Sequence, residues 1–265
     1  MAEPSPLALR DARLYAFFHV VFTRFFRRHM GALRVPPWGL PADNGRRPLI
    51  VLANHPSWWD GVAFMLLSAR LFPTRQVFIP MEAAALAKYR FMRRLGVFGI
   101  EPGPRGAVAF LRTAAEVLAA PRAMLWMNAP GRFQDVRERP VVIAPGVTRL
   151  PEITPDAVVL PLALDYVFWT EPRAEMLAAF GTPLEARDLL TLDREAREAR
   201  IREALTETMD RLTAEAITRD PARFVVVAEG AEGMGGIYDH WRRFTALLRG
   251  RRFDPRHARR AGRTR

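Results

Sequence analysis

Residues 50–60 read IVLANHPSWWD, a short apolar run that leads through a turn into a helix-forming segment. The run Leu49–Ala53 is typical of a buried strand, because it is apolar throughout and ends at turn-forming residues. A helix is expected to start at Ser57 or at the tryptophan that follows it. His55 and Asp60 therefore lie between a strand and a helix, where the loops of a parallel sheet usually carry functional groups.

The alternation of strands and helices continues along the chain. Further apolar runs of strand type are Val77–Ile79, Met124–Met127, Val158–Leu164 and Phe224–Val227. Helical patterns occupy about 58–71, 82–94, 106–120 and the charged, amphipathic 194–219. Strands that alternate with helices imply an α/β fold, with a mainly parallel sheet flanked by helices.

Length and composition fit one large globular domain with extensions. The chain has 265 residues, of which 49% are hydrophobic and 26% charged, so it can bury a full core. It contains no cysteine, which excludes disulfides and thiolate metal sites and leaves no requirement for an oxidising compartment. No apolar core of secretory type precedes Leu14, so we expect no signal peptide and a cytoplasmic setting.

The chain is strongly basic, with a formal net charge of +12, and Lys88 is the only lysine among its 40 basic residues. Such a surface attracts anionic lipid or nucleic acid. No basic–aromatic β-surface, helix-turn-helix or zinc pattern is visible, so we expect no nucleic-acid partner. The histidines lack metal-ligand spacing, and we expect no metal and no other cofactor. Residues 251–265 are arginine-rich and predict a basic tail that adds attraction to an anionic membrane surface.

The N-terminal residues 7–30 are predicted to be helical. Their uninterrupted apolar run is Leu14–Phe22, which is too short to span a bilayer, since a spanning helix needs about 20 apolar residues. Apolar residues recur at helical spacing with arginines at one end: Phe17, Phe18, Val21, Phe22, Phe25, Phe26, Arg24, Arg27 and Arg28. This pattern predicts an amphipathic helix that contacts the headgroup region of a membrane, and the alternative is a helix packed on the protein core.

His55 and Asp60 are residue types that can serve as a base and as the carboxylate that orients it. Residues five apart do not align on a straight helix, but a turn at Pro56 can bring the Asp60 carboxylate back to the imidazole. Such a pair is what a site needs when the nucleophile belongs to the substrate. The alternative is a capping box, in which Ser57 caps the helix and Asp60 supports its first turn. In that interpretation His55 is only a turn residue.

Four sequence blocks resemble those of a known family and follow in its order. N-H-P-S-W-W-D at 54–60 resembles the His-x4-Asp block of the glycerolphosphate acyltransferase family, the lysophospholipid acyltransferases. The second, third and fourth blocks correspond to Gly99–Arg105, Trp126–Arg132 and Val159–Ala163. The resemblance spans roughly residues 45–170, and its first block is the most specific one.

The resemblance implies an O-acyltransferase. His55 would deprotonate a lipid hydroxyl, Asp60 would orient the imidazole, and the oxygen would attack a fatty acyl thioester of acyl-CoA or acyl-carrier protein. Arg105 would bind a phosphate of the acceptor, Gly131 would allow close backbone approach, and Pro161 would shape the wall of the site. These last three residues also have simpler interpretations as a solvated arginine, a turn glycine and a sheet-edge or bulge proline.

The third block departs from the family pattern. A polar residue, often glutamate, usually precedes its glycine, whereas Pro130 stands there and has neither a side-chain acceptor nor a backbone N–H. Asn128 and Arg132 are the candidates to compensate for this loss. We therefore predict an acceptor other than lysophosphatidate, such as a glycolipid, a glycosylated terpenoid or another hydroxylated lipid.

In this interpretation residues 1–40 form a membrane-associating segment, residues 41–250 the acyltransferase domain and residues 251–265 the tail. The protein would act as a peripheral or monotopic enzyme on the cytoplasmic face of an anionic membrane. The alternative is a catalytically inactive relative that binds membranes or partner proteins, in which capping geometry alone retains His55 and Asp60.

Overall fold

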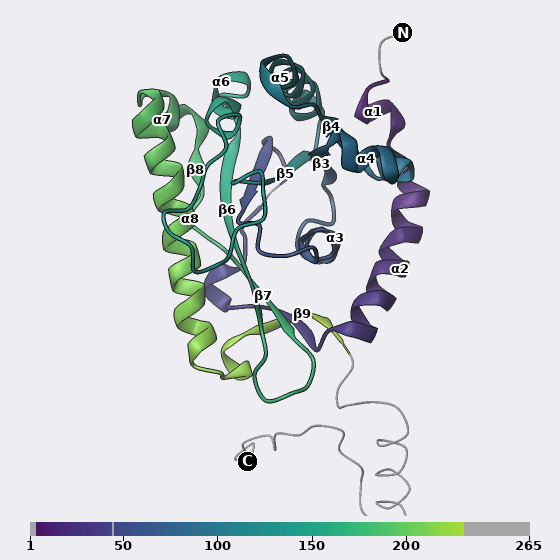
Figure 1. Cartoon of the computed structure of the whole chain (residues 1–265), viewed down its shortest axis with the longest axis vertical. Helices are drawn as coiled ribbons and strands as arrows, with labels where there is room; N and C mark the ends of the chain where they lie inside the picture. The colour runs from purple at the N-terminus through teal and green to yellow at the C-terminus, as the bar shows by residue number, and fades with distance from the viewer. Residues whose placement is uncertain (1–3, 44, 231–265) are drawn as a thin grey trace, which may run out of the picture.

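The computed structural model describes residues 4–43 and 45–230. Its strands are β1 (Ala32–Val35), β2 (Leu49–Ala53), β3 (Gln76–Glu82), β4 (Val97–Ile100), β5 (Ala123–Asn128), β6 (Val158–Val167), β7 (Glu175–Phe180), β8 (Leu184–Glu185) and β9 (Val225–Glu229). Within the described residues they form one 9-stranded sheet in the order β4-β3-β5-β2-β6-β7-β1-β9, with β8 beside β6. This sheet runs through the middle of the molecule in Figure 1.

The sheet is parallel on the side that carries the quoted turn. β4, β3, β5, β2 and β6 are parallel to one another. β7 is antiparallel to β6, β1 is parallel to β7, and β9 is antiparallel to β1. The prediction of an α/β fold with a mainly parallel sheet flanked by helices is therefore confirmed. Parallel strands bring their carboxyl ends to one edge, and the turn after β2 lies at that edge.

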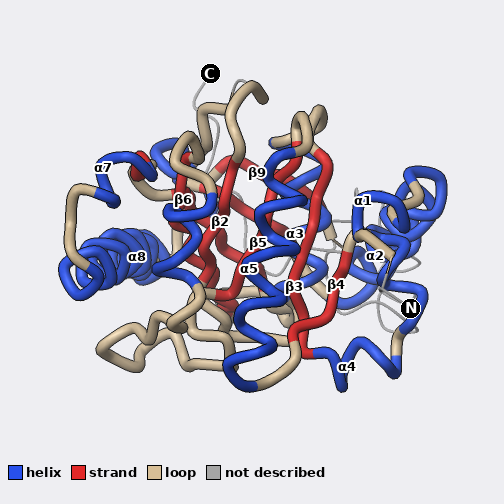
Figure 2. Tube along the Cα trace, turned by 90° about the horizontal axis from the view of Figure 1, so that it is seen from above, coloured by secondary structure: helices blue, strands red, loops and turns tan. Residues whose placement is uncertain are grey.

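Helices cover both faces of the sheet. They are α1 (Pro6–Leu9), α2 (Ala12–His29), α3 (Asp60–Leu71), α4 (Ala83–Lys88), α5 (Gly103–Ala119), α6 (Leu150–Ile153), α7 (Ala186–Leu190) and α8 (Arg194–Ile217), with the 3-10 helices η1 (Pro37–Gly39), η2 (Arg90–Leu95), η3 (Val147–Arg149) and η4 (Pro221–Arg223). Residues of α2 and α3 pack on one face, and residues of α5, α6, α7 and α8 pack on the other. Figure 1 and Figure 2 show the two layers of helices from perpendicular directions.

The central strands are buried on both faces, as their continuous apolar runs require. On β2, Leu49, Val51 and Ala53 face α2 and α3, whereas Ile50 and Leu52 face α5 and α8. This alternation decides toward which face each side chain at the end of a strand points.

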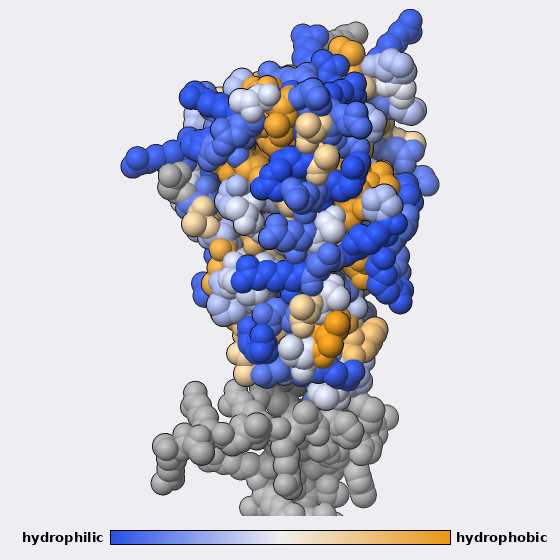
Figure 3. Space-filling view, turned by 90° about the vertical axis from the view of Figure 1, so that its left-hand side faces the viewer, coloured by the Kyte–Doolittle hydropathy of each residue, from blue (hydrophilic) through white to orange (hydrophobic). Residues whose placement is uncertain are grey.

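The α7 and α8 side of the molecule is mostly hydrophilic at its surface (Figure 3). α8 is anchored on its inner side by Arg197, which is buried. The guanidinium of Arg197 donates to three backbone carbonyl oxygens and pairs with Glu152. Each nitrogen of the guanidinium therefore has an acceptor, which a buried charged group requires.

Several elements differ from the sequence-based prediction. The helix expected from Ser57 or the next residue begins at Asp60. The helix expected over 7–30 is divided into α1 and α2, because the Asp11 side chain accepts two N–H groups and caps a new helix. The stretch 82–94 contains α4 and η2 in place of one helix. The strands β1, β4, β7 and β8 have no counterpart among the apolar runs predicted as strands.

The N-terminal segment 1–40 contributes to the sheet as well as carrying α2. Its strand β1 pairs with β7 on one side and with β9 on the other. The sheet therefore begins before residue 41, where the domain was expected to begin. The predicted tail, residues 251–265, lies outside the described residues.

α2 packs on α3 and η2 through aromatic side chains. Phe26 is fully buried. Phe18 stacks on Phe91 of η2 with 4.7 Å between ring centroids, and Phe25 stacks on Trp59 with 5.0 Å between centroids. This part of the phenylalanine row faces the protein, as the alternative of a core-packed helix requires.

The opposite side of α2 is exposed and partly apolar. Phe17, Val20 and Val21 are its exposed large hydrophobic residues, and Phe17 is 61% exposed. Among the described residues, no helix is both long and apolar enough to cross a bilayer.

Candidate active site

The turn after β2 is held in place by Asn54. The side-chain amide of this buried residue donates to the carbonyl oxygen of Leu164 at 2.9 Å, and its amide oxygen accepts the Leu164 N–H at 2.7 Å. The Asn54 N–H also donates to Leu162 O at 3.3 Å. These contacts extend the pairing of β2 with β6 beyond the end of β2, so the turn has a defined position at the carboxyl edge of the sheet.

His55 and Asp60 lie in direct contact. The His55 Nδ1 atom is 2.6 Å from Asp60 Oδ2. The side chain of His55 is 19% exposed, and Asp60 is fully buried. Because a carboxylate accepts, Nδ1 carries the hydrogen and Nε2 keeps its lone pair for another group. The turn through Pro56 thus brings together two residues that a straight helix would keep apart, and it leaves the imidazole partly exposed to solvent.

The capping box is not formed. The N-cap residue of α3 is Trp59, which makes no side-chain capping hydrogen bond, and Asp60 is the first helical residue. The Ser57 hydroxyl instead accepts the N–H of Trp59 at 3.2 Å. The Ser57 N–H lies 3.4 Å from Asp60 Oδ2. The turn therefore contributes one weak backbone contact to the carboxylate, and the short contact of that oxygen is with the imidazole.

Tyr166 is the second side chain that binds Asp60. Its hydroxyl donates to Asp60 Oδ1 at 2.6 Å. Burial, followed by the negative charge of Asp60, raises the pKa of Tyr166 well above its ordinary value, so the phenol keeps its proton. Tyr166 was not among the residues predicted from the sequence. Its signal was the alternation of β6, since Leu162, Leu164 and Tyr166 all pack on the α3 side.

The loop after β5 covers one face of the imidazole. The rings of Phe133 and His55 are stacked, with 4.2 Å between centroids and 29° between planes, and Phe133 is 57% exposed. The N–H of the next residue, Gln134, donates to His55 O at 2.9 Å. The buried Gln134 side chain binds Pro140 O and the N–H of Val142. Neither Phe133 nor Gln134 was singled out in the sequence, because their contact with His55 arises from the path of this loop.

The third block forms a tight turn at the end of β5. The Gly131 N–H donates to Asn128 O at 3.0 Å, and the φ angle of Gly131 is 67°, a conformation that favours glycine. The turn therefore explains Gly131 without a ligand. The side-chain oxygen of Asn128 is buried and has no hydrogen-bond partner in the described part of the chain. Arg132 is exposed and reaches Glu138 at 3.4 Å.

The other two residues that the resemblance implicated lie apart from the pair. Arg105 is exposed in the first turn of α5, which begins at the carboxyl edge just after β4. Its side chain makes no hydrogen bond or ion pair with the described residues. Pro161 is buried within β6, level with Leu52, so it lies inside the sheet rather than at the edge where His55 lies.

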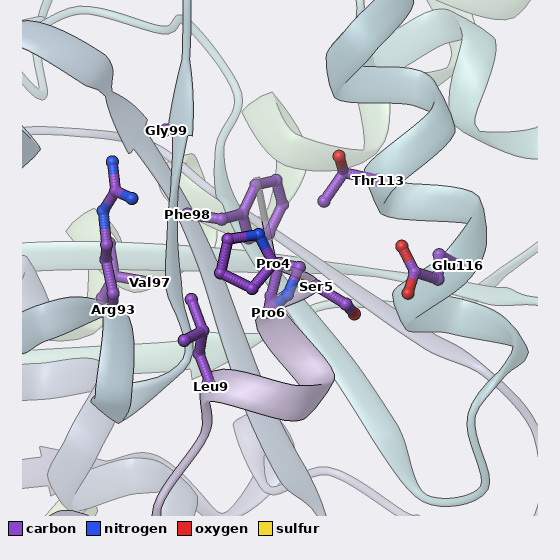
Figure 4. Close-up of a pocket in the computed structure, with 10 residues that line it drawn as sticks. All are labelled: Pro4, Ser5, Pro6, Leu9, Arg93, Val97, Phe98, Gly99, Thr113 and Glu116. Carbon is purple, nitrogen blue, oxygen red and sulfur yellow. The ribbon is translucent and has the colours of Figure 1, made fainter. Parts of the chain in front are cut away.

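The cavities among the described residues include two small ones. One of about 100 Å³ lies between α1, β4 and α5 and is lined by residues such as Pro6, Phe98 and Glu116 (Figure 4). None of its lining residues belongs to the His55 turn. The other, of about 10 Å³, lies between β6, α8 and Asn54. Across residues 4–43 and 45–230, no three His, Asp or Glu side chains gather so that they could hold a metal ion.

Comparison with known proteins identifies a solved structure with a similar fold. No protein-family model matches the chain, and no curated protein matches it in sequence. Among solved structures, it is similar to the crystal structure of the 1-acyl-sn-glycerophosphate (LPA) acyltransferase, PlsC, from Thermotoga maritima. The TM-score is 0.51 at 17% sequence identity, over 79% of this chain and 86% of that chain. The chain therefore has an α/β fold similar to that of a lysophosphatidate acyltransferase.

Proposed function

We propose that this protein is an O-acyltransferase that transfers a fatty acyl group from acyl-CoA or acyl-carrier protein to a lipid hydroxyl. The observation that carries the proposal is the 2.6 Å contact between His55 Nδ1 and the buried Asp60 carboxylate. The pair lies at the carboxyl edge of a parallel sheet and leaves Nε2 free to accept a proton. The similar fold of a solved 1-acyl-sn-glycerophosphate acyltransferase supports the same activity class.

In the proposed reaction, His55 Nε2 takes the proton of the acceptor hydroxyl as its oxygen attacks the thioester carbonyl carbon. The tetrahedral intermediate then collapses, the carbon–sulfur bond breaks, and the imidazolium returns the proton to the thiolate. Asp60 stabilises the imidazolium by its charge and by its hydrogen bond to Nδ1. The face of the Phe133 ring over His55 favours the same cation.

The acceptor hydroxyl would approach past an apolar part of the loop after β5. Phe133 presents an exposed ring beside His55, Pro130 has no N–H to offer, and the Gly131 N–H is used by its own turn. Arg132 reaches Glu138. These features favour a hydroxyl on a glycolipid, a glycosylated terpenoid or another lipid over one beside a phosphate.

An acceptor panel tests both the activity and this preference. Purified protein is given acyl-CoA or acyl-carrier protein with lysophosphatidate or with hydroxylated lipids, and ester formation is measured by mass spectrometry. We expect transfer to at least one non-phosphate acceptor at a kcat/KM about tenfold or more above that for lysophosphatidate. Preferred turnover of lysophosphatidate would overturn the acceptor proposal alone. Transfer to no acceptor from either donor would overturn the proposed function.

We further propose that the protein binds the cytoplasmic face of an anionic membrane through the outer side of α2. This side combines exposed Phe17, Val20 and Val21 with arginines in the C-terminal half of the helix. Trp58, which is 65% exposed and lies three residues after His55, contacts Phe25 of α2. Tryptophan favours the membrane interface, so such binding would bring the base close to lipid acceptors.

Substitution of the outer side of α2 tests this proposal. Phe17→Asp with Val20→Asp should reduce sedimentation with anionic vesicles about tenfold or more, because two inserted apolar side chains become charged. High salt should weaken binding of the native chain. The matched control is Val108→Asp with Ile217→Asp, two exposed aliphatic residues on α5 and α8. If both variants lose vesicle binding equally, or if neither loses it, the binding surface lies elsewhere. Substitutions are preferable to deletion of 1–34, which would remove most of β1.

A further inference from the structure

Both oxygens of the Asp60 carboxylate are occupied. Oδ2 faces His55 Nδ1 at 2.6 Å, and Oδ1 accepts the Tyr166 hydroxyl at 2.6 Å. The carboxylate is fully buried. A carboxylate held at one oxygen only can rotate about its Cβ–Cγ bond, whereas one held at both oxygens has a defined orientation.

We propose that Tyr166 is the positioning residue of the His55–Asp60 pair: its hydroxyl holds Asp60 Oδ1 so that Oδ2 stays directed at the imidazole. The same hydrogen bond reduces the negative charge that Asp60 presents to the imidazole. This inference deepens the proposed function and rests on it only where acyl transfer is measured.

The backbone around Tyr166 supports a precise placement. Tyr166 lies on β6 two residues after Leu164, the residue whose N–H and carbonyl both bind the Asn54 side chain. The same strand therefore positions the turn that carries His55 and the hydroxyl that binds Asp60. Its ring packs against the core on the α3 side, where the first turn of α3 presents the carboxylate. β6 therefore fixes the position of the His55–Asp60 pair through two contacts, one with Asn54 and one with Asp60.

The charges around the hydroxyl keep it a donor. Asp60 faces it from α3, and His55 lies beyond Asp60. Asp165 precedes Tyr166 on β6, and it interacts with Asp135 and Arg137 of the loop after β5. Burial and the nearby carboxylates raise the pKa of the phenol well above its ordinary value. The phenol therefore stays neutral and donates to Asp60.

The hydrogen bond between Tyr166 and Asp60 affects the protonation of His55, because its strength depends on the charge of the imidazole. The Tyr166 hydroxyl binds Asp60 more strongly when the imidazole is neutral, because a protonated imidazole already compensates the carboxylate. The bond therefore favours neutral His55. Its removal should shift the titration midpoint of His55 to higher pH.

The test is Tyr166→Phe, which removes the hydroxyl and keeps the ring. The titration of the His55 imidazole is followed by NMR, with its signals assigned by their absence from His55→Ala. We expect the midpoint of His55 to rise by about half a pH unit or more. In acyl transfer, kcat should fall about tenfold with little change in KM, and the acidic limb of the pH profile should move in the same direction.

The matched control is Tyr15→Phe. Tyr15 is a tyrosine whose hydroxyl is buried and has no hydrogen-bond partner among the described residues, and burial raises its pKa to about 12. Tyr15→Phe removes the same atom from another buried site and should leave the His55 titration unchanged. A purely structural role for Tyr166 would lower the unfolding temperature without moving the His55 midpoint, and this result would overturn the proposal.

A second measurement applies even if Tyr166→Phe does not fold. Replacement of the four tyrosines by 3-fluorotyrosine makes each phenol a stronger donor with a small change in volume. It should shift the His55 midpoint to lower pH, and an unchanged midpoint would overturn the proposal. The titration needs no substrate. A shifted midpoint in a protein that acylates no acceptor would therefore keep the role of Tyr166 and reject the proposed function.

Discussion

His55→Ala should lose at least about 10²–10⁴ in acyl-transfer rate while its unfolding temperature stays near that of the native chain. The imidazole is the base of the proposed reaction, and its Nε2 atom is free because Nδ1 binds Asp60. The side chain is partly exposed at the edge of the sheet, so its truncation leaves no closed cavity in the core. The rate is measured as thiol release from the donor together with ester formation.

The control for this variant is His29→Ala. His29 is an exposed histidine on α2 that contacts Phe25 and Trp59, so its loss should leave the rate within about a factor of two. Retention of more than about a tenth of native activity by His55→Ala would show that the base is another group. An inactive native chain that still binds vesicles would favour the catalytically inactive relative.

Asp60→Asn should lose about 10²–10⁴ in rate, close to the loss in His55→Ala. The asparagine oxygen can still accept the Tyr166 hydroxyl, which then directs the amide NH₂ group toward His55. An amide donor there requires a lone pair on Nδ1, so Nε2 would carry the hydrogen and present the wrong tautomer to the acceptor. The variant also lacks the charge that stabilises the imidazolium.

The matched control is Asp43→Asn, the same change in another ion pair. Asp43 binds the buried Arg75, and its substitution should lower the free energy of unfolding by about 1–3 kcal/mol without altering the rate at temperatures where the protein is folded. Asp60→Asn should show the opposite pattern, with a large kinetic loss and a smaller change in stability. Native-like kinetics in Asp60→Asn would leave the pair without the proposed role.

The local parts of the site were predictable because they are encoded by neighbouring residues. Leu49–Ala53 forms β2 with the predicted bounds, since a continuous apolar run that ends at Asn54 has few alternatives. The return of Asp60 to His55 depends on a turn within the same short stretch. β7 escaped prediction because its residues, EMLAAF, include strong helix formers, and only pairing with β6 and β1 makes them a strand.

The sequence by itself therefore determined the α/β class, the strand-to-turn segment that carries His55, and the candidate pair with Asp60. Only the tertiary structure decided which side of α2 is exposed, because both sides carry apolar residues and packing on α3 and η2 selects one. It also decided that Tyr166 binds the second oxygen of the Asp60 carboxylate and that the Phe133 ring stacks on the His55 imidazole. Tyr166 is 106 residues from Asp60 in sequence, and such a contact follows from strand order and register, which no local spacing encodes.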